Sequence, residues 1–189
     1  MALRNHQLAY EKPTQNETLW VLRAQVGDRE AFGQIFLWSE RLLRAHIMSI
    51  LRDPAAVEDV LQEVFLTIYR RIKWLRDPNL FRPWVFRVGT REALRFRRRH
   101  FDRREDPLDL EVGSVSGESR LVAGLLSKEV LLRLEAVSAE SRAILSLHYL
   151  EDMSISEAAD ILGVPVGTAK SRLARGIRKL KALLTKEGR

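Results

Sequence analysis

Residues 154–181 read SISEAADILGVPVGTAKSRLARGIRKLK, and the helix signals in this segment constrain the fold more than any other part of the chain. Ser154 can accept a hydrogen bond from the unpaired backbone N–H groups of a helix N-terminus, and Glu157 can reach back to the same end, as in a capping box. Gly163 can adopt a positive φ at no steric cost, and Pro165 suits the opening of a further helix. The segment therefore predicts two helices joined by a tight turn.

The second of these helices has two unlike faces. Its apolar residues recur at helical spacing and are expected to pack inward: Val166, Ala169, Leu173, Ile177 and Leu180. The other surfaces carry small, hydroxyl-bearing and basic side chains, and such a helix fits the major groove of DNA. The candidate DNA-contacting residues are Thr168, Lys170, Ser171, Arg172, Ala174 and Arg175. Taken alone, this segment could also be a surface helical hairpin with solvated charges.

The distribution of charge favours DNA over a solvated hairpin. The chain has 189 residues and a net charge of +7, yet residues 166–189 alone carry +7 and residues 87–104 carry +6. The remainder is acidic overall, so the basic residues are concentrated in two blocks. This concentration is expected of two separate contacts with nucleic acid.

Helical periodicity dominates the chain, and no sustained alternating pattern predicts a strand. We therefore expect an all-α fold of two small helical domains joined by a flexible acidic linker, with the helix-turn-helix in the second domain. Residues 105–118 indicate the linker, because they contain five acids, no basic residue, two glycines and a proline. The predicted boundaries are a polar N-terminal tail at 1–16, a first domain at 17–102, the linker at 103–126 and a second domain at 127–189.

Four helices are expected in the first domain and about four in the second. Asp28 and Asp53 are placed to cap the second and third helices, and Pro54 suits a first helical position. The loop at 75–82 contains Asp, Pro and Asn, which favour turns. The predicted helices of the first domain cover about 17–26, 29–51, 54–74 and 83–101.

The third helix combines an apolar face with an acidic one. Its inward face is predicted to hold Val57, Leu61, Val64, Phe65, Ile68 and Ile72. The opposite face carries Asp59, Gln62, Glu63 and Leu66, spaced i, i+3, i+4 and i+7. Acids near a helix start also interact favourably with the helix dipole, which is a purely structural explanation. An acidic stripe containing an exposed leucine otherwise suits a protein partner.

The fourth helix and the loop before it interleave aromatic rings with arginines. Unpaired bases stack on aromatic rings and phosphates attract cations, so this combination suits single-stranded nucleic acid. The candidate residues are Trp74, Asn79, Phe81, Arg87, Arg91, Arg95 and Arg98. Trp84 and Phe96 are expected to be core residues from their helical positions.

Several classes of function find no support in the sequence. There is no cysteine, and the four histidines are scattered without metal-ligand spacing, so we expect neither a metal site nor a cofactor. There is no glycine-rich phosphate loop and no nucleophile paired with a base, so we do not expect an enzyme. No segment has the length of a signal peptide core or a membrane span, and we expect a cytoplasmic protein.

Three segments resemble the bacterial extracytoplasmic-function (ECF) sigma factors of RNA polymerase: EDVLQEVFLTIYRR at 58–71, RPWVFRVGTREALRFRRRH at 82–100, and the helix-turn-helix. The resemblance implies a region-two domain that binds the clamp helices of the largest polymerase subunit and captures the −10 strand. It also implies a region-four domain that contacts the flap of the second-largest subunit and reads the −35 duplex. An anti-sigma factor is a further implied partner, with no membrane insertion.

The resemblance also assigns roles to the candidate residues. Polymerase would be contacted by Asp59, Gln62, Glu63 and Leu66, and the −10 strand by the loop and fourth helix. In the recognition helix, Thr168 and Arg172 would hold phosphates, while Lys170, Ser171, Ala174 and Arg175 would face bases. One departure stands out, because many relatives have Arg-Asn and a later Asp where this chain has Thr90, Arg91 and Arg95.

Two other functions remain open at the level of sequence. One is an ordinary helix-turn-helix regulator that binds duplex operators as a dimer. The acidic stripe and the arginine-rich aromatic helix argue against it, because an operator-binding protein requires neither. The other is a sigma-like interaction module without promoter activity, if the departure at Thr90 and Arg91 abolishes strand capture.

Overall fold

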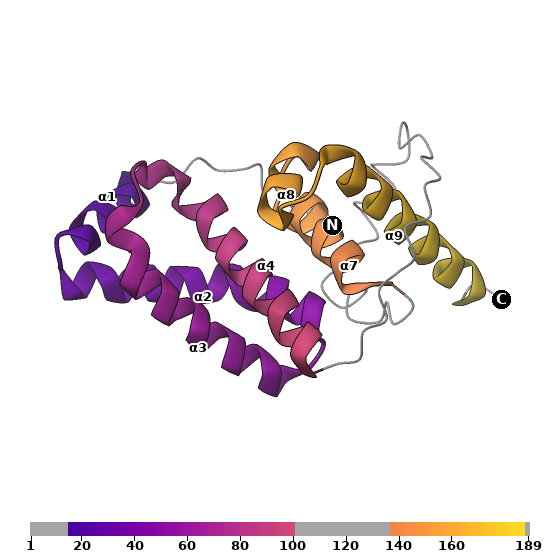
Figure 1. Cartoon of the computed structure of the whole chain (residues 1–189), viewed down its shortest axis with the longest axis horizontal. Helices are drawn as coiled ribbons and strands as arrows, with labels where there is room; N and C mark the ends of the chain where they lie inside the picture. The colour runs from indigo at the N-terminus through magenta and orange to yellow at the C-terminus, as the bar shows by residue number, and fades with distance from the viewer. Residues whose placement is uncertain (1–14, 101–136, 188–189) are drawn as a thin grey trace, which may run out of the picture.

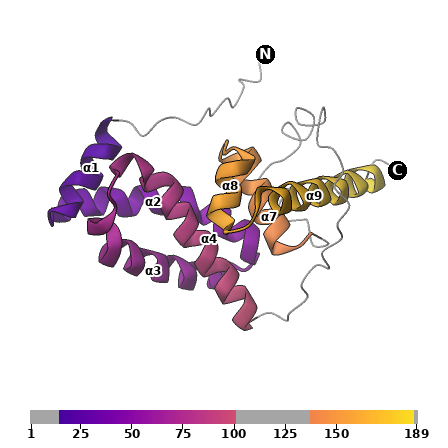
Figure 2. The ribbon, with the colours of Figure 1, turned by 45° about the horizontal axis from the view of Figure 1, so that its top comes forward.

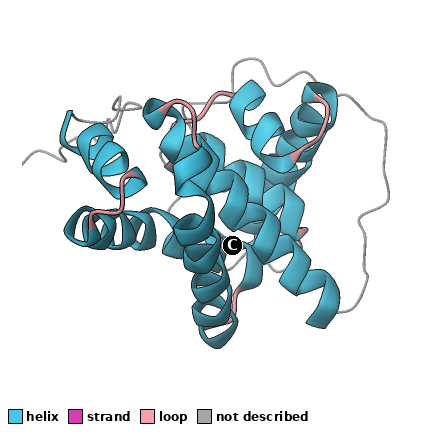
Figure 3. Cartoon of the chain, turned by 60° about the vertical axis from the view of Figure 1, so that its left-hand side comes forward, coloured by secondary structure: helices cyan, strands magenta, loops and turns pink. Residues whose placement is uncertain are grey.

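The structure, a computed structural model, describes residues 15–100 and 137–187. Within these ranges every regular element is helical and there is no strand (Figures 1 and 3), which confirms the all-α prediction. The predicted linker at 103–126 and the start of the second domain lie outside the described residues.

The N-terminal half contains four helices, as predicted. They are α1 Gln15–Gln25, α2 Arg29–Leu51, α3 Pro54–Arg71 and α4 Phe81–His100. Two short 3₁₀ turns, Ile72–Trp74 and Pro78–Leu80, connect α3 to α4. The Asp28 carboxylate accepts hydrogen bonds from the first backbone N–H groups of α2, and Asp53 does the same for α3, so both predicted caps are confirmed.

Helix α2 lies at the centre of this half and packs against α1, α3 and α4. Its inward residues Ile35, Leu43 and Ile47 are fully buried, and they meet the apolar faces of the neighbouring helices. Phe36, on the same helix, is 37% exposed. The apolar run at 36–38 is too continuous for one helix face, and of its residues Trp38 is the one that belongs to the core.

The C-terminal half contains α7 Ala139–Leu145, a π-helical segment Ser146–Leu150, α8 Ile155–Leu162 and α9 Val166–Glu187. Helices α8 and α9 form the predicted helix-turn-helix, and Gly163 between them has φ of 68°. Helix α9 continues past the segment 154–181 to Glu187. It points away from the N-terminal half, so that α1 and the far end of α9 lie at opposite ends of the molecule (Figures 1 and 2).

The two halves pack directly against each other, which the sequence did not predict. Helix α7 lies against α2, and α8 lies against α4 (Figure 2). At the centre of the contact, the Arg142 side chain of α7 is buried and its guanidinium donates hydrogen bonds to the carbonyls of Ser49, at 2.6 Å, and Ile50, at 2.7 Å. A third bond goes to the carbonyl of Val137 in its own half.

A buried histidine and an ion pair complete the contact. The His46 ring lies 3.1 Å from the Ser146 hydroxyl through Nδ1 and 2.8 Å from the Thr90 hydroxyl through Nε2. Arg82 of α4 pairs with the Glu151 carboxylate at 3.0 Å. Thr90, at the position where the chain departs from many relatives, is therefore a buried residue that supports the domain contact rather than an exposed one.

The burial of His46 predicts that folding stability depends on pH. Removal from water disfavours the imidazolium and lowers the pKa of His46 from 6.5 to about 3. Between these values the unfolded chain binds more protons than the folded chain, so stability falls as the pH decreases. Urea unfolding should give a free energy about 2 kcal/mol lower at pH 5 than at pH 7.5 from this group alone.

The control for this prediction is a pair of identical substitutions. His46→Gln should remove most of this pH dependence, whereas His100→Gln, at an exposed position on α4, should retain it. An unchanged slope in the His46 variant would contradict the assignment.

Candidate nucleic-acid and polymerase interfaces

The acidic stripe on α3 is exposed along its length. Asp59, Gln62 and Glu63 are exposed and Leu66 is 45% exposed, while Val57 and Val64 on the opposite face are fully buried. Among the described residues, none makes a hydrogen bond or ion pair with the side chains of Asp59, Gln62 or Glu63. These polar groups are therefore open to an external partner.

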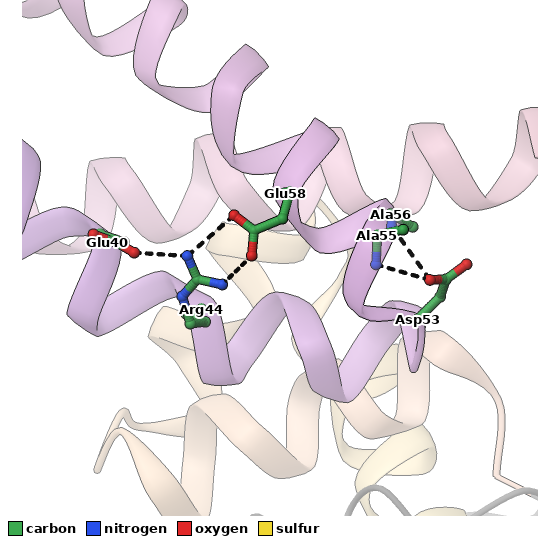
Figure 4. A network of polar contacts seen from close by, with 6 residues as sticks. All are labelled: Glu40, Arg44, Asp53, Ala55, Ala56 and Glu58. Carbon is green, nitrogen blue, oxygen red and sulfur yellow. Dashed lines mark hydrogen bonds and ion pairs between the residues drawn. The ribbon is translucent and has the colours of Figure 1, made fainter.

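Glu58, next to the stripe, has a structural role. The Arg44 guanidinium of α2 bonds both oxygens of the Glu58 carboxylate, and it also bonds Glu40 at 2.6 Å (Figure 4). The hydrogen bonds from Arg44 lower the pKa of Glu58, which stays ionised. The same view shows Asp53 capping α3 through the N–H groups of Ala55 and Ala56 (Figure 4). Arg44 thus fixes α3 against α2 and sets the orientation of the stripe.

Exposed aromatic residues border the stripe, and the sequence analysis missed them. The Phe36 and Phe65 rings lie 4.0 Å apart between centroids, and Phe32 meets the edge of Tyr69 at 5.0 Å. Tyr69 is 67% exposed. The signal was present in the sequence, because Tyr69 falls one turn after Leu66 on the same face of α3. Together they extend the acidic stripe with apolar surface suited to a protein contact.

The stripe continues into a groove of about 360 Å³ between α3 and α4. Asp59, Gln62 and Glu63 line one wall, and Arg95, Arg99 and His100 line the other. Arg95 also pairs with Glu92 on its own helix at 3.1 Å. The groove therefore brings the predicted polymerase-contacting and strand-contacting residues together at one end of the N-terminal half.

The predicted strand-contacting residues divide into exposed and buried members. Trp74 is 66% exposed, with the Lys73 amino group 4.5 Å from its ring centroid. Arg87, Arg91, Arg95 and Arg98 are exposed along α4. Asn79 is exposed but its amide bonds Asp77 and Thr18 within the protein.

Phe81 does not fit the sequence prediction of a loop residue open to bases. It begins α4, it is 1% exposed, and its ring stacks on Trp38 with centroids 5.1 Å apart. The prediction was wrong because the Asp77 cap at 3₁₀ turn Pro78–Leu80 brings the chain into helix two residues earlier than expected. Trp84 and Phe96, which were predicted as core residues, are half-buried and pack against the hydrophobic core.

The recognition helix α9 rests on α7 and α8 through its apolar face. Ala169, Leu173, Ile177 and Leu180 are buried as predicted, whereas Val166, at the start of the helix, is 40% exposed. Lys170 is exposed and the other candidates are half-buried: Thr168, Ser171, Arg172, Ala174 and Arg175. The Ser171 hydroxyl donates to the Gly167 carbonyl at 3.0 Å.

The predicted capping box at the start of α8 is present. The Glu157 N–H donates to the Ser154 hydroxyl at 3.2 Å, and the Ser154 N–H donates to the Glu157 carboxylate at 2.8 Å. Because α8 supports α9, this cap helps to fix the orientation of the recognition helix.

No cluster of His, Cys, Asp and Glu suited to a metal ion occurs in the described ranges. Over those ranges, too, no helix is long and apolar enough to cross a membrane.

Comparison with known proteins places the chain in a family. It matches the models for Sigma-70 region 2 over residues 39–102 and Sigma-70, region 4 over residues 127–180. It is 35% identical over 179 residues to the RNA polymerase sigma factor NccH of Alcaligenes xylosoxydans xylosoxydans, an alignment that covers 91% of this chain and 96% of NccH. It is 27% identical over 180 residues to the ECF RNA polymerase sigma factor SigW of Bacillus subtilis strain 168, covering 87% of this chain and 94% of SigW.

The structural comparison agrees. A solved structure of CnrH in complex with the cytosolic domain of CnrY superposes with a TM-score of 0.65 at 26% identity, covering 90% of this chain and 98% of that one. The chain therefore belongs to the sigma-70 family of RNA polymerase sigma factors, which direct promoter recognition. Within that family it is an ECF sigma factor.

The capping box predicts how the helix-turn-helix responds to a single substitution. Ser154→Ala removes the side-chain acceptor at the start of α8 and should lower the free energy of unfolding by about 1 kcal/mol. Chemical denaturation followed by circular dichroism measures this loss. Ser156→Ala, an exposed change inside the same helix, should have almost no effect or stabilise slightly. Equal losses in the two variants would contradict a specific capping role.

Proposed function

We propose that this sigma factor makes three contacts in initiation. The α3 stripe binds core RNA polymerase, the loop and α4 capture the −10 strand, and α9 reads the −35 duplex. The observation that carries the proposal is the two-sided character of α3. It buries one face in the core and, on the other, exposes an apolar residue and acids that pair with none of the described residues.

The polymerase contact is assigned to Asp59, Gln62, Glu63 and Leu66. A rigid helix presents them, because Arg44 holds α3 to α2 and the buried face fixes its rotation. Clamp helices of the largest subunit are the partner that the family resemblance implies. Exposed Phe36 and Tyr69 add apolar area at the border of the same face.

The −10 contact is assigned to the exposed ring of Trp74 and to arginines along α4. A base that leaves the duplex loses its stacking partners and gains one on an aromatic ring, while the guanidinium groups neutralise the phosphates. The assigned residues are Trp74, Arg87, Arg91, Arg95 and Arg98. Asn79 orders the loop.

The −35 contact is assigned to α9. Arg172 and Thr168 hold the phosphates on either side of the groove, and Lys170, Ser171, Ala174 and Arg175 face the base edges. The apolar face of the helix is buried on α7 and α8, so the remaining surface is the one that can enter the major groove.

An anti-sigma factor is a further proposed partner, supported by the relative CnrH, which has been solved in complex with the cytosolic domain of CnrY. We propose that the chain acts in the bacterial cytoplasm and performs no covalent chemistry itself. An operator-binding regulator without a polymerase role is not favoured, because both sigma regions are matched.

The polymerase contact can be tested by removing its polar groups. Asp59→Asn combined with Gln62→Ala should weaken binding to core polymerase about tenfold or more, because polar contacts at a buried interface centre are lost. Analytical gel filtration and fluorescence titration with labelled core measure the change. Asp152→Asn, at an exposed position in the other half, is the charge-matched control and should bind normally. Unaltered core binding by the double variant would refute the assignment.

In the −35 contact, one arginine is expected to contribute to sequence specificity and another to affinity for any duplex, so two substitutions can distinguish these contributions. Arg175→Ala should cost about 1–3 kcal/mol on the preferred duplex and much less on a scrambled one, because a base contact carries sequence information. Arg172→Ala should weaken both duplexes alike and reduce the salt slope by about one unit, because one fewer counterion is released. Fluorescence anisotropy of the full chain over a salt series measures both effects.

The control for the −35 experiment is Arg41→Ala, which removes an exposed arginine from α2, remote from the recognition helix. It should leave the specificity ratio unchanged. If Arg175→Ala lowers binding to both duplexes equally, Arg175 does not read bases.

A further inference from the structure

Helix α1, to which neither the sequence nor the proposed function assigns a role, is hydrogen-bonded to the loop at 72–80, which precedes α4 and carries Trp74. The Gln25 side-chain nitrogen donates to the Ile72 carbonyl at 3.0 Å and to the Leu75 carbonyl at 2.7 Å. These two carbonyls lie immediately on either side of Lys73 and Trp74. One side-chain amide, from a helix far away in the sequence, therefore holds both ends of the turn that carries the exposed Trp74.

A second contact from α1 reaches the other end of the loop. The Thr18 hydroxyl donates to the Asn79 side-chain oxygen at 3.2 Å. Asn79 in turn donates its backbone N–H, at 2.9 Å, and its side-chain amide, at 3.0 Å, to the Asp77 carboxylate. The polar atoms of Asn79 are thus engaged in ordering the loop, and the large apolar side chains that the loop exposes are Trp74 and Leu80.

We propose that Gln25 is a positioning residue for capture of single-stranded DNA, acting through Trp74; this inference rests on the proposed −10 function. By holding the carbonyls of Ile72 and Leu75, the Gln25 amide fixes the 3₁₀ turn and keeps the Trp74 ring projecting for a base to stack on. Thr18 supports the same loop through Asn79.

The two hydrogen bonds to Ile72 and Leu75 require two N–H donors on one atom of the side chain at position 25. Both acceptors are backbone carbonyls, so a carboxylate at position 25 would face two acceptors without a proton, and a thioether would leave both carbonyls without the amide. A loop that is already ordered loses less conformational entropy when the strand binds, and this raises the affinity for the strand without any direct contact to DNA.

The test uses the holoenzyme assembled from core polymerase and the full chain. A fluorescent single-stranded oligonucleotide, selected by the wild-type holoenzyme from a randomised pool, is the probe. Gln25→Met should weaken its binding about fivefold to tenfold, the effect of one or two net hydrogen bonds. Thr18→Val should weaken it about twofold to threefold. Gln34→Met, the same change at an exposed position on α2, should have no effect.

A double-mutant cycle separates positioning from a general loss of stability. In a Trp74→Ala background, Gln25→Met should cause less than a twofold further loss, because its effect passes through the ring that has been removed. Core binding, measured in the same samples, should be unchanged in every variant. Additive losses, or wild-type strand binding by both the Gln25 and Thr18 variants, would overturn the inference while leaving the −10 function intact. If the wild-type holoenzyme selects no strand from the pool, the −10 function and this inference are both overturned.

Discussion

The Arg142 guanidinium joins the two halves of this protein, and the arrangement of its surfaces depends on that contact. The last carbonyls of a helix have no partner within the helix. At the end of α2, the backbone N–H of Arg52 donates a hydrogen bond to the Met48 carbonyl. The Arg142 guanidinium of α7 donates hydrogen bonds to the carbonyls of Ser49 and Ile50. The positive charge also interacts favourably with the negative end of the helix dipole. A residue 92 positions away from Ile50 thus completes the C-terminus of the central helix.

The same central helix organises the surfaces of the N-terminal half. Through Arg44 it fixes α3, whose acids then face outward, and through its buried face it supports α4 with its exposed arginines. Helix α1 also packs on α2 and orders the loop that carries Trp74. Each surface of the N-terminal half that is assigned to polymerase or DNA is therefore presented by a helix or loop that α2 or α1 holds in place.

Local sequence signals predicted the helices and their caps well. Contacts between residues far apart in the sequence were not predicted. The caps at Asp28, Asp53 and Ser154 and the positive φ of Gly163 followed from neighbouring residues alone. The contact of Arg142 with α2 had no local signal, because its acceptors are backbone carbonyls that any sequence supplies. The exposure of the α3 stripe was predictable from helical spacing. The burial of Phe81 and Thr90 was not, because Phe81 packs on α2 and Thr90 pairs with a histidine of α2.

The central claim is that this chain confers promoter selection on core polymerase through two DNA-reading surfaces. Run-off transcription on a library of genomic fragments, with purified core alone and with core plus the full chain, tests it most directly. The account predicts discrete transcripts only when the chain is present, from start sites that share one −35 and one −10 element at a fixed spacing. Transcripts that are the same with and without the chain, or start sites with no common upstream element, would contradict it.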